Sequence, residues 1–135
     1  MRSYYTTAMF LSLGAASTCD TLREWGDANN FLIGSQFKYD EMNDIDTYAE
    51  VHGREMAISV AGNACKPSSV QKTRGEFDFT ECLDLAKRAY NNGQKFRGHA
   101  LVWHNQQPSW MHALEGTDTY ANLYNTWDDI MKTHI

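Results

Sequence analysis

The side chains best suited to chemistry gather in one stretch, residues 97–110, which reads RGHALVWHNQQPSW. Within it, Trp103 is followed at once by His104, Asn105 and Gln106. A sugar ring has apolar C–H faces and a rim of hydroxyls, so a sugar site needs a flat aromatic ring beside neutral donors and acceptors. The stretch therefore indicates sugar binding. The structural alternative is a tryptophan in the core, because this residue is highly buried on average.

Short apolar runs predict the strands that position this stretch. Residues 100–102 are Ala-Leu-Val, a run typical of a strand buried on both faces, and Pro108 then ends regular pairing. Similar runs at residues 31–35 and 56–60 predict two earlier strands. The polar residues that follow the second run are expected to form a loop at a strand end.

Helical patterns separate these strands. Apolar residues recur at spacings of three and four over residues 39–52, which predicts one amphipathic helix that Gly53 ends. Asp78 and Glu81 resemble a capping box at the start of a second helix, and residues 92–93, Asn-Gly, are a typical helix end. A third helical stripe follows, formed by Tyr120, Leu123, Tyr124, Trp127, Ile130 and Met131.

Strand and helix thus alternate three times, which predicts an α/β fold with a parallel sheet. A doubly wound sheet shares this alternation. However, no Gly-x-Gly-x-x-Gly follows any of the strands, so a nucleotide cofactor is not expected.

Two patterns of charged residues and histidines are explained without a catalytic or metal site. The carboxylates of the first predicted helix lie opposite its apolar stripe. They are therefore expected to form a solvated face and not a catalytic site. His99, His104 and His112 lack the spacing of His-Glu-x-x-His, so no metal site is predicted. The 135 residues carry a net charge of −5 with dispersed cations, which is not the basic patch of a nucleic-acid-binding protein.

The first residues have the layout of a secretory leader. Arg2 precedes a mostly apolar segment that gives way to small residues at 14–17. The segment is shorter than the roughly 20 residues of a membrane span, so we expect a cleaved signal peptide at residues 1–19, an extracellular protein and no membrane association afterwards. An ordinary N-terminal helix is the alternative.

The site of leader cleavage decides the cysteine count. Cleavage after Ala16 or Ser17 leaves three cysteines, whereas cleavage after Cys19 leaves only Cys65 and Cys82. On the second alternative these two are expected to form a disulfide, which export permits and which contributes about 3 kcal/mol for a loop of this size.

The order of residues adds a family resemblance. Arg-Gly-His, an apolar run, Trp-His, a polar residue, Gln, any residue and Pro-Ser-Trp resembles the third-strand signature of glycoside hydrolase family 10, the endo-β-1,4-xylanases. The resemblance continues at residues 54–56, 62–66 and 75–79 and covers the chain roughly from Phe31 onward. It implies a (β/α)8 TIM barrel, of which residues 20–135 hold the N-terminal part, about the first three βα units.

The resemblance also implies a secreted enzyme that hydrolyses internal β-1,4-xylosidic bonds of xylan with retention. That mechanism uses two glutamates about 5–5.5 Å apart. The acid/base glutamate belongs to a Trp-Asp-x-x-Asn-Glu motif and the nucleophile to a later strand, and neither motif occurs in this sequence. We therefore assign no catalytic residue and expect this chain alone to be inactive. The alternative is a non-catalytic truncated relative that binds plant-wall polysaccharide or another protein.

Carried over position by position, the resemblance implies a substrate-binding set. Two members lie in the loop after the second strand, and three lie around the cleavage site: Asn63 and Lys66, then His99, Trp103 and Gln106. His104 also matches the pattern and is expected to orient its neighbours or to fill the wall of the site, not to contact substrate.

Two positions depart from the family pattern. The family usually has Glu before the residue matched by Asn63 and Trp after the residue matched by Lys66, whereas this chain has Gly62 and Pro67. A missing acceptor leaves a sugar hydroxyl unpaired, at a cost of about 1–3 kcal/mol of binding. Either affinity or sugar preference is therefore expected to differ from that of a typical xylanase.

Overall fold

A sheet of three short parallel strands organises the chain, for which a computed structural model describes residues 19–101, 103–113 and 132. The strands lie in chain order, β1 (Gly34–Phe37), β2 (Ile58–Ala61) and β3 (Lys95–Arg97). The helices are α1 (Leu22–Ala28), α2 (Tyr39–Asp44), α3 (Asp46–Glu55), α4 (Pro67–Val70), α5 (Thr80–Asn91) and α6 (Ser109–His112). This order confirms the predicted α/β class.

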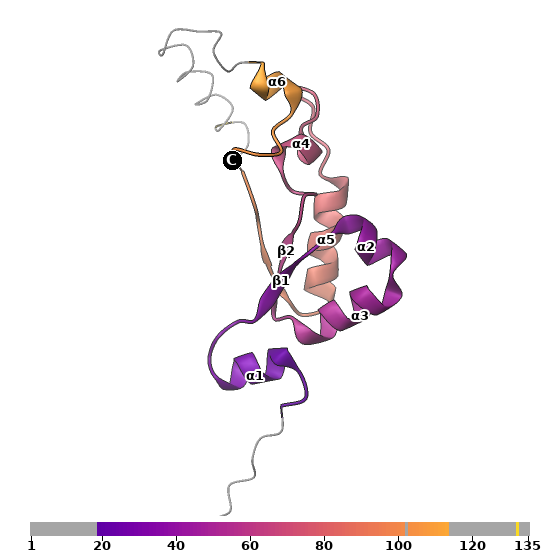
Figure 1. The fold of residues 1–135 in the computed structure, drawn as a ribbon, viewed down its shortest axis with the longest axis vertical. Coiled ribbons are helices and arrows are strands. Elements are labelled where there is room, and N and C mark those ends of the chain that lie inside the picture. The colour runs from indigo at the N-terminus through magenta and orange to yellow at the C-terminus, as the bar shows by residue number, and fades with distance from the viewer. Residues whose placement is uncertain (1–18, 102, 114–131, 133–135) are drawn as a thin grey trace, which may run out of the picture.

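One face of the sheet is covered by helices. Figure 1 shows α2, α3 and α5 on the same side of the strands, with α1 near the amino ends and α4 and α6 beyond the carboxyl ends. The core lies between the sheet and the helices. Its buried members are Phe37, Met42, Ala61, Ala64, Leu85 and Ala89.

The other face of the sheet is open. Gln36 pairs in register with Val60, and Val60 with Arg97, so these side chains form one row. Because side chains alternate along a strand, this row points away from Phe37, which is only 1% exposed. The row lines an open hollow on the side of the sheet that becomes the interior in a barrel.

All three strands lie at positions in the sequence that differ from the predicted ones. Residues 31–35 and 56–60 were expected, and the strands begin two or three positions later. The third prediction, residues 100–102, was wrong, because β3 ends at Arg97 and Leu101 is 59% exposed. An uninterrupted apolar run marks a strand buried on both faces. Here one face carries polar residues such as Arg97, so the true strands do not show that run.

The single helix expected over residues 39–52 is two helices. Ile45 has an extended backbone with φ −128° and ψ 93°, which separates α2 from α3. Gly53 lies inside α3 and does not end it. A Cβ at Gly53 would lie 2.8 Å from Nδ2 of Asn92, so this glycine allows close contact with the end of α5.

Helix α5 begins differently from the prediction and ends as predicted. Its N-cap is Phe79, and the expected reciprocal capping box is absent, although Oδ1 of Asp78 accepts from the Thr80 amide at 2.9 Å. At the other end Gly93 has φ 64°, a conformation that suits glycine. The predicted leader and the helical stripe at residues 120–131 lie outside the described residues.

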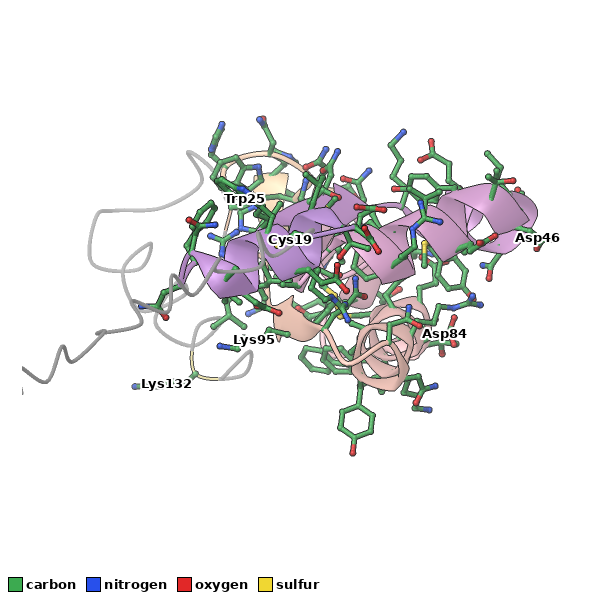
Figure 2. All side chains as sticks on the ribbon, turned by 90° about the horizontal axis from the view of Figure 1, so that it is seen from below. Cys19, Trp25, Asp46, Asp84, Lys95 and Lys132 are labelled. Atoms are coloured by element: carbon green, nitrogen blue, oxygen red, sulfur yellow. A yellow bond between two sulfur atoms is a disulfide. The ribbon has the colours of Figure 1, made fainter. Side chains whose placement is uncertain are left out.

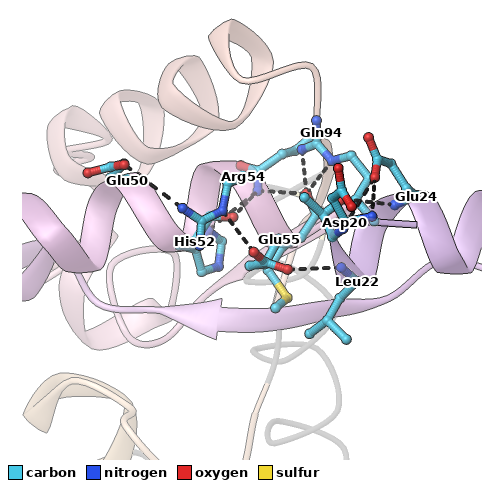
Figure 3. Close-up of polar contacts among 11 residues, drawn as sticks. Asp20, Leu22, Glu24, Glu50, His52, Arg54, Glu55 and Gln94 are labelled. Atoms are coloured by element: carbon cyan, nitrogen blue, oxygen red, sulfur yellow. Dashed lines mark hydrogen bonds and ion pairs between the residues drawn. The ribbon is translucent and has the colours of Figure 1, made fainter. Parts of the chain in front are cut away.

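Helix α1, which the sequence did not predict, is bonded to the ends of α3 and α5. Glu55 accepts a hydrogen bond from the Leu22 amide at 2.9 Å and is also paired with Arg54, as Figure 3 shows. The Arg23 guanidinium bonds to the carbonyls of Met56 and Asn92. These contacts lie at the amino ends of the strands. Among the described residues, no helix has the length and apolarity to cross a membrane.

Candidate functional site

Three of the five predicted site residues meet at the carboxyl end of the sheet. Nζ of Lys66 donates to Oδ1 of Asn63 at 3.0 Å and to Oε1 of Gln106 at 2.7 Å. Asn63 and Lys66 come from the loop after β2, and Gln106 comes from the segment after β3. The ammonium therefore joins two strand-end loops through charge-assisted hydrogen bonds.

The backbone holds these loops in register. The Gly62 amide donates to the Phe37 carbonyl at 2.8 Å, which continues the β1–β2 pairing into the loop. The Ser68 amide, in the first turn of α4, donates to the Gln106 carbonyl at 2.9 Å. Gln106 has φ 50°, a left-handed conformation that is costly for a residue with a side chain and tends to cluster at functional sites.

A disulfide fixes the loop between Asn63 and Lys66 to the helical layer. Cys65 is bonded to Cys82 in the first turn of α5, with their Cα atoms 4.9 Å apart. These are the two cysteines paired in the sequence analysis. Cys65 also packs against the core cluster, so the Lys66 loop is anchored both covalently and by burial.

The remaining predicted residues form a separate aromatic group. The His99 ring meets the Trp103 ring edge-on, with centroids 5.3 Å apart, and the His104 ring lies 4.4 Å from Trp103 on a tilted plane. Gln107 donates to the Trp103 carbonyl at 2.8 Å. In the part of the chain that the structure describes, no hydrogen bond or ring contact joins this group to the Lys66 set.

Helix α6 is held against the end of α4. The indole N–H of Trp110 donates to the Gln71 carbonyl at 2.9 Å, and the Arg74 guanidinium lies 5.8 Å from the centre of the Trp110 ring. Figure 1 shows the two short helices side by side beyond the strands. Met111 of α6 is also buried, at 2% exposure.

Four of the carboxylates on α2 and α3 are exposed: Asp40, Asp44, Asp46 and Glu50. Glu41 is paired with Lys38 at 2.6 Å, which raises the pKa of the Lys38 ammonium. Asp46 stands at the end of the molecule remote from Trp25 (Figure 2). Within residues 19–101 and 103–113, no group of His, Cys, Asp and Glu side chains is arranged to hold a metal ion.

Comparison with known proteins identifies the fold that carries this geometry. The model of glycosyl hydrolase family 10 matches residues 21–135. The chain belongs to glycosyl hydrolase family 10. Its sheet, with the loops after β2 and β3 at one edge, is therefore part of a (β/α)8 barrel.

Family 10 relatives include curated bacterial enzymes. Over 105 residues, 78% of this chain, it is 39% identical to endo-1,4-β-xylanase A of Thermoanaerobacterium saccharolyticum. Over the same length it is 34% identical to the exoglucanase XynX of Acetivibrio thermocellus. The chain spans only 9% and 10% of the length of these two relatives.

Solved family 10 structures match the described fold. Xylanase 10B of Thermotoga maritima is 31% identical with a TM-score of 0.73, over 84% of this chain and 35% of that one. Xylanase 10B of Thermotoga petrophila in complex with xylobiose is 28% identical with a TM-score of 0.74, over 89% of this chain and 36% of that one.

Two residues that support the site were missed in the sequence analysis. Gln107 falls at a position where the family pattern allows any residue, yet its amide donates to the Trp103 carbonyl. Gln71 was not singled out, although its carbonyl holds the Trp110 indole. The only signal for Gln107 was its position directly after Gln106, and Gln71 acts through its backbone, which no residue type reveals.

Proposed function

We propose that residues 20–135 carry the non-reducing-side part of the sugar site of a secreted, retaining endo-β-1,4-xylanase. The observation that carries this proposal is the hydrogen-bonded set of Asn63, Lys66 and Gln106 at the carboxyl edge of a family 10 sheet. Active sites of TIM barrels lie at that edge. The related xylanase solved with xylobiose supports the substrate class, a β-1,4-linked xylan.

The contacts around Lys66 leave suitable groups for sugar hydroxyls. An ammonium has three N–H donors, and two are occupied by Asn63 and Gln106. Among the described residues no partner is seen for the third donor, which can therefore bind a hydroxyl oxygen. Because both amides accept through their oxygen atoms, their NH2 groups are turned to donate to further hydroxyls.

The aromatic group supplies the complementary surface. Trp103 is half-buried, so part of its ring remains free to stack on the apolar face of a sugar. The edge contact with His99 fixes the angle between the rings. We assign Trp103 and His99 to the sugar next to the cleaved bond, and Lys66 and Asn63 to more remote sugars.

The test compares the 135-residue chain with a completed barrel, in which residues 21–135 replace the matching part of the Thermotoga petrophila xylanase. Retaining hydrolysis needs two carboxyl groups at a fixed short separation, and no such pair is assigned in this chain. Release of reducing sugar from xylan is expected from the completed barrel and not from the chain alone. Turnover by the chain alone contradicts the proposal, and so does a completed barrel that keeps full activity without His99 and Trp103.

A further inference from the structure

The hydrogen-bonded set around Lys66 offers mainly donors to a ligand. The amide oxygens of Asn63 and Gln106 each accept one hydrogen bond from the ammonium, so each amide keeps two N–H donors but only one lone pair for a ligand. A sugar hydroxyl donates as well as accepts, so a site of this kind also needs an acceptor oxygen. A side-chain oxygen from a neighbouring strand would add to the few acceptor sites that the set retains.

The position beside Asn63 that lacks a side chain is Gly62. Its amide is bonded to the Phe37 carbonyl, so Gly62 lies against the carboxyl end of β1. A Cβ on Gly62 would lie 3.4 Å from Cγ of Lys38, 3.4 Å from the Phe37 carbonyl oxygen and 3.7 Å from Oε1 of Gln36. These are ordinary contact distances, so the space beside Gly62 admits a Cβ without a clash.

Of these three neighbours, Gln36 is the one that brings a side-chain oxygen. The Phe37 carbonyl accepts from Gly62, and the Lys38 ammonium is bonded to Glu41 at 2.6 Å and is held toward α2. Gln36 is exposed and lies in the row with Val60 and Arg97 on the open face of the sheet. Its Oε1 therefore borders both the open face and the space beside Asn63.

We propose that Gln36 is a specificity-determining residue of the sugar site, whose Oε1 accepts a hydrogen bond from a sugar hydroxyl at the position that Gly62 leaves without a side chain. The inference rests on the proposed function, and the ligand class is a neutral β-1,4-linked xylo-oligosaccharide. An amide oxygen does not titrate, so this contact does not depend on pH. A glutamate at position 62 would reach the same space from the neighbouring strand and would carry a charge.

The test measures xylotriose binding by the 135-residue chain through NMR titration. Gln36→Met keeps the length of the side chain and removes the acceptor, and it is expected to raise Kd about three- to tenfold, the worth of one neutral hydrogen bond. Gln36→Glu keeps an oxygen and is expected to bind within twofold of wild type. Gly62→Glu in the Gln36→Met background is expected to restore affinity and to make it fall below about pH 4.3, where a glutamate becomes protonated. Lys87→Ala, at an exposed position of α5, is the control and is expected to leave Kd unchanged.

The outcomes separate the two proposals. If Gln36→Met raises Kd by the same factor with and without Gly62→Glu, the inference is overturned, because the two residues then do not share one role. A Kd that Lys66→Ala raises and Gln36→Met leaves unchanged also overturns it, while the proposed function stands. If the chain alone gives no titration, the same variants are compared by KM for xylotetraose in the completed barrel. Indifference to both Lys66→Ala and Gln36→Met there contradicts the proposed function as well.

Discussion

Nζ of Lys66 donates a 2.7 Å hydrogen bond to Oε1 of Gln106, 40 residues further along the chain. The two side chains come from the segments that follow β2 and β3, which are neighbouring strands, so the bond links these segments at the carboxyl edge of the sheet. Lys66 also bonds to Asn63. A single cation therefore sets the positions of two amides.

Loss of this cation is expected to weaken substrate binding more than catalysis. Lys66→Ala in the completed barrel removes charge-assisted hydrogen bonds worth about 1.5–3 kcal/mol each when intact, and we expect KM for xylotetraose to rise about tenfold with little change in kcat. The aromatic group is expected to matter more for catalysis than Lys66 does. His99→Ala or Trp103→Ala is expected to lower kcat/KM about 10²-fold, because these residues position the sugar beside the cleaved bond. Initial rates measure these variants and Lys66→Ala, with Lys87→Ala on the exposed side of α5 as the control. A larger effect at Lys66 than at Trp103 would contradict the assignment.

Removal of the disulfide is expected to destabilise the chain and loosen the Lys66 loop. Replacing Cys65 and Cys82 with serine opens a cross-link with a sequence separation of 17, and we expect the free energy of unfolding to fall by about 3 kcal/mol. Urea unfolding under non-reducing conditions measures this. Cys19→Ser, at a free cysteine, is the control. Detection of both Cys65 and Cys82 as free thiols in the mature protein by mass spectrometry would contradict the prediction.

Stability is expected to fall as His52 becomes protonated. Burial lowers the pKa of His52 below its ordinary value of 6.5, between the Phe37 and Tyr48 rings and beside the Gln94 amide, with Arg23 adding a like charge. The unfolded chain then binds this proton more readily than the folded chain. The contribution is therefore fully present above pH 6.5 and is lost as the pH falls toward the lowered value.

Urea midpoints at pH 7.5, 6.5 and 5.5 measure this dependence. His52→Gln removes the titrating group, so its midpoint is expected to change less over this range than that of wild type. Hydrogen bonds lower the pKa values of Glu55, from the Leu22 amide, and of Asp78, from Thr80. Their stabilising contributions are therefore lost as the pH falls through the usual carboxyl range, below the range tested here. If the urea midpoint changes equally with pH in wild type and in His52→Gln, the histidine is not the cause of the pH dependence.

The leader-like sequence predicts export. We propose that the mature chain begins between Ser17 and Asp20, because a charged residue and an apolar segment precede small residues there. Amino-terminal sequencing of protein from the culture medium tests this. Replacing Leu11 and Leu13 with aspartate is expected to abolish export, since the apolar segment is what the secretion machinery reads. Recovery of Met1 outside the cell would contradict the proposal.

The sequence was most informative where residue type and order both matter. Alternating strand and helix patterns predicted the parallel sheet, and Asn92-Gly93 predicted the end of α5, because a glycine at positive φ is a local requirement. Asn63, Lys66 and Gln106 were selected by their place in a family pattern, and the fold brings them into contact.

Other features depend on contacts that no local pattern contains. Gly53 resembled a helix end, yet it serves the approach of Asn92, 39 positions later. Strand β3 was missed because its side chains Lys95 and Arg97 face the open side of the sheet, where charge is tolerated. Gln36 gave no signal at all, because its relation to Gly62 exists only after β1 and β2 have paired.

The strand order β1-β2-β3 has a consequence for biosynthesis. Each strand pairs with the one that precedes it in the chain, so β2 finds its partner already made when it leaves the ribosome, and β3 does the same. The chain is synthesised from its amino terminus, at about 5–20 residues per second. Lys66 emerges early, whereas its partner Gln106 follows 40 residues later, a delay of about 2–8 s at that rate. The sheet can therefore grow outward from β1 during translation, and the Lys66–Gln106 bond closes only after the third strand has been added.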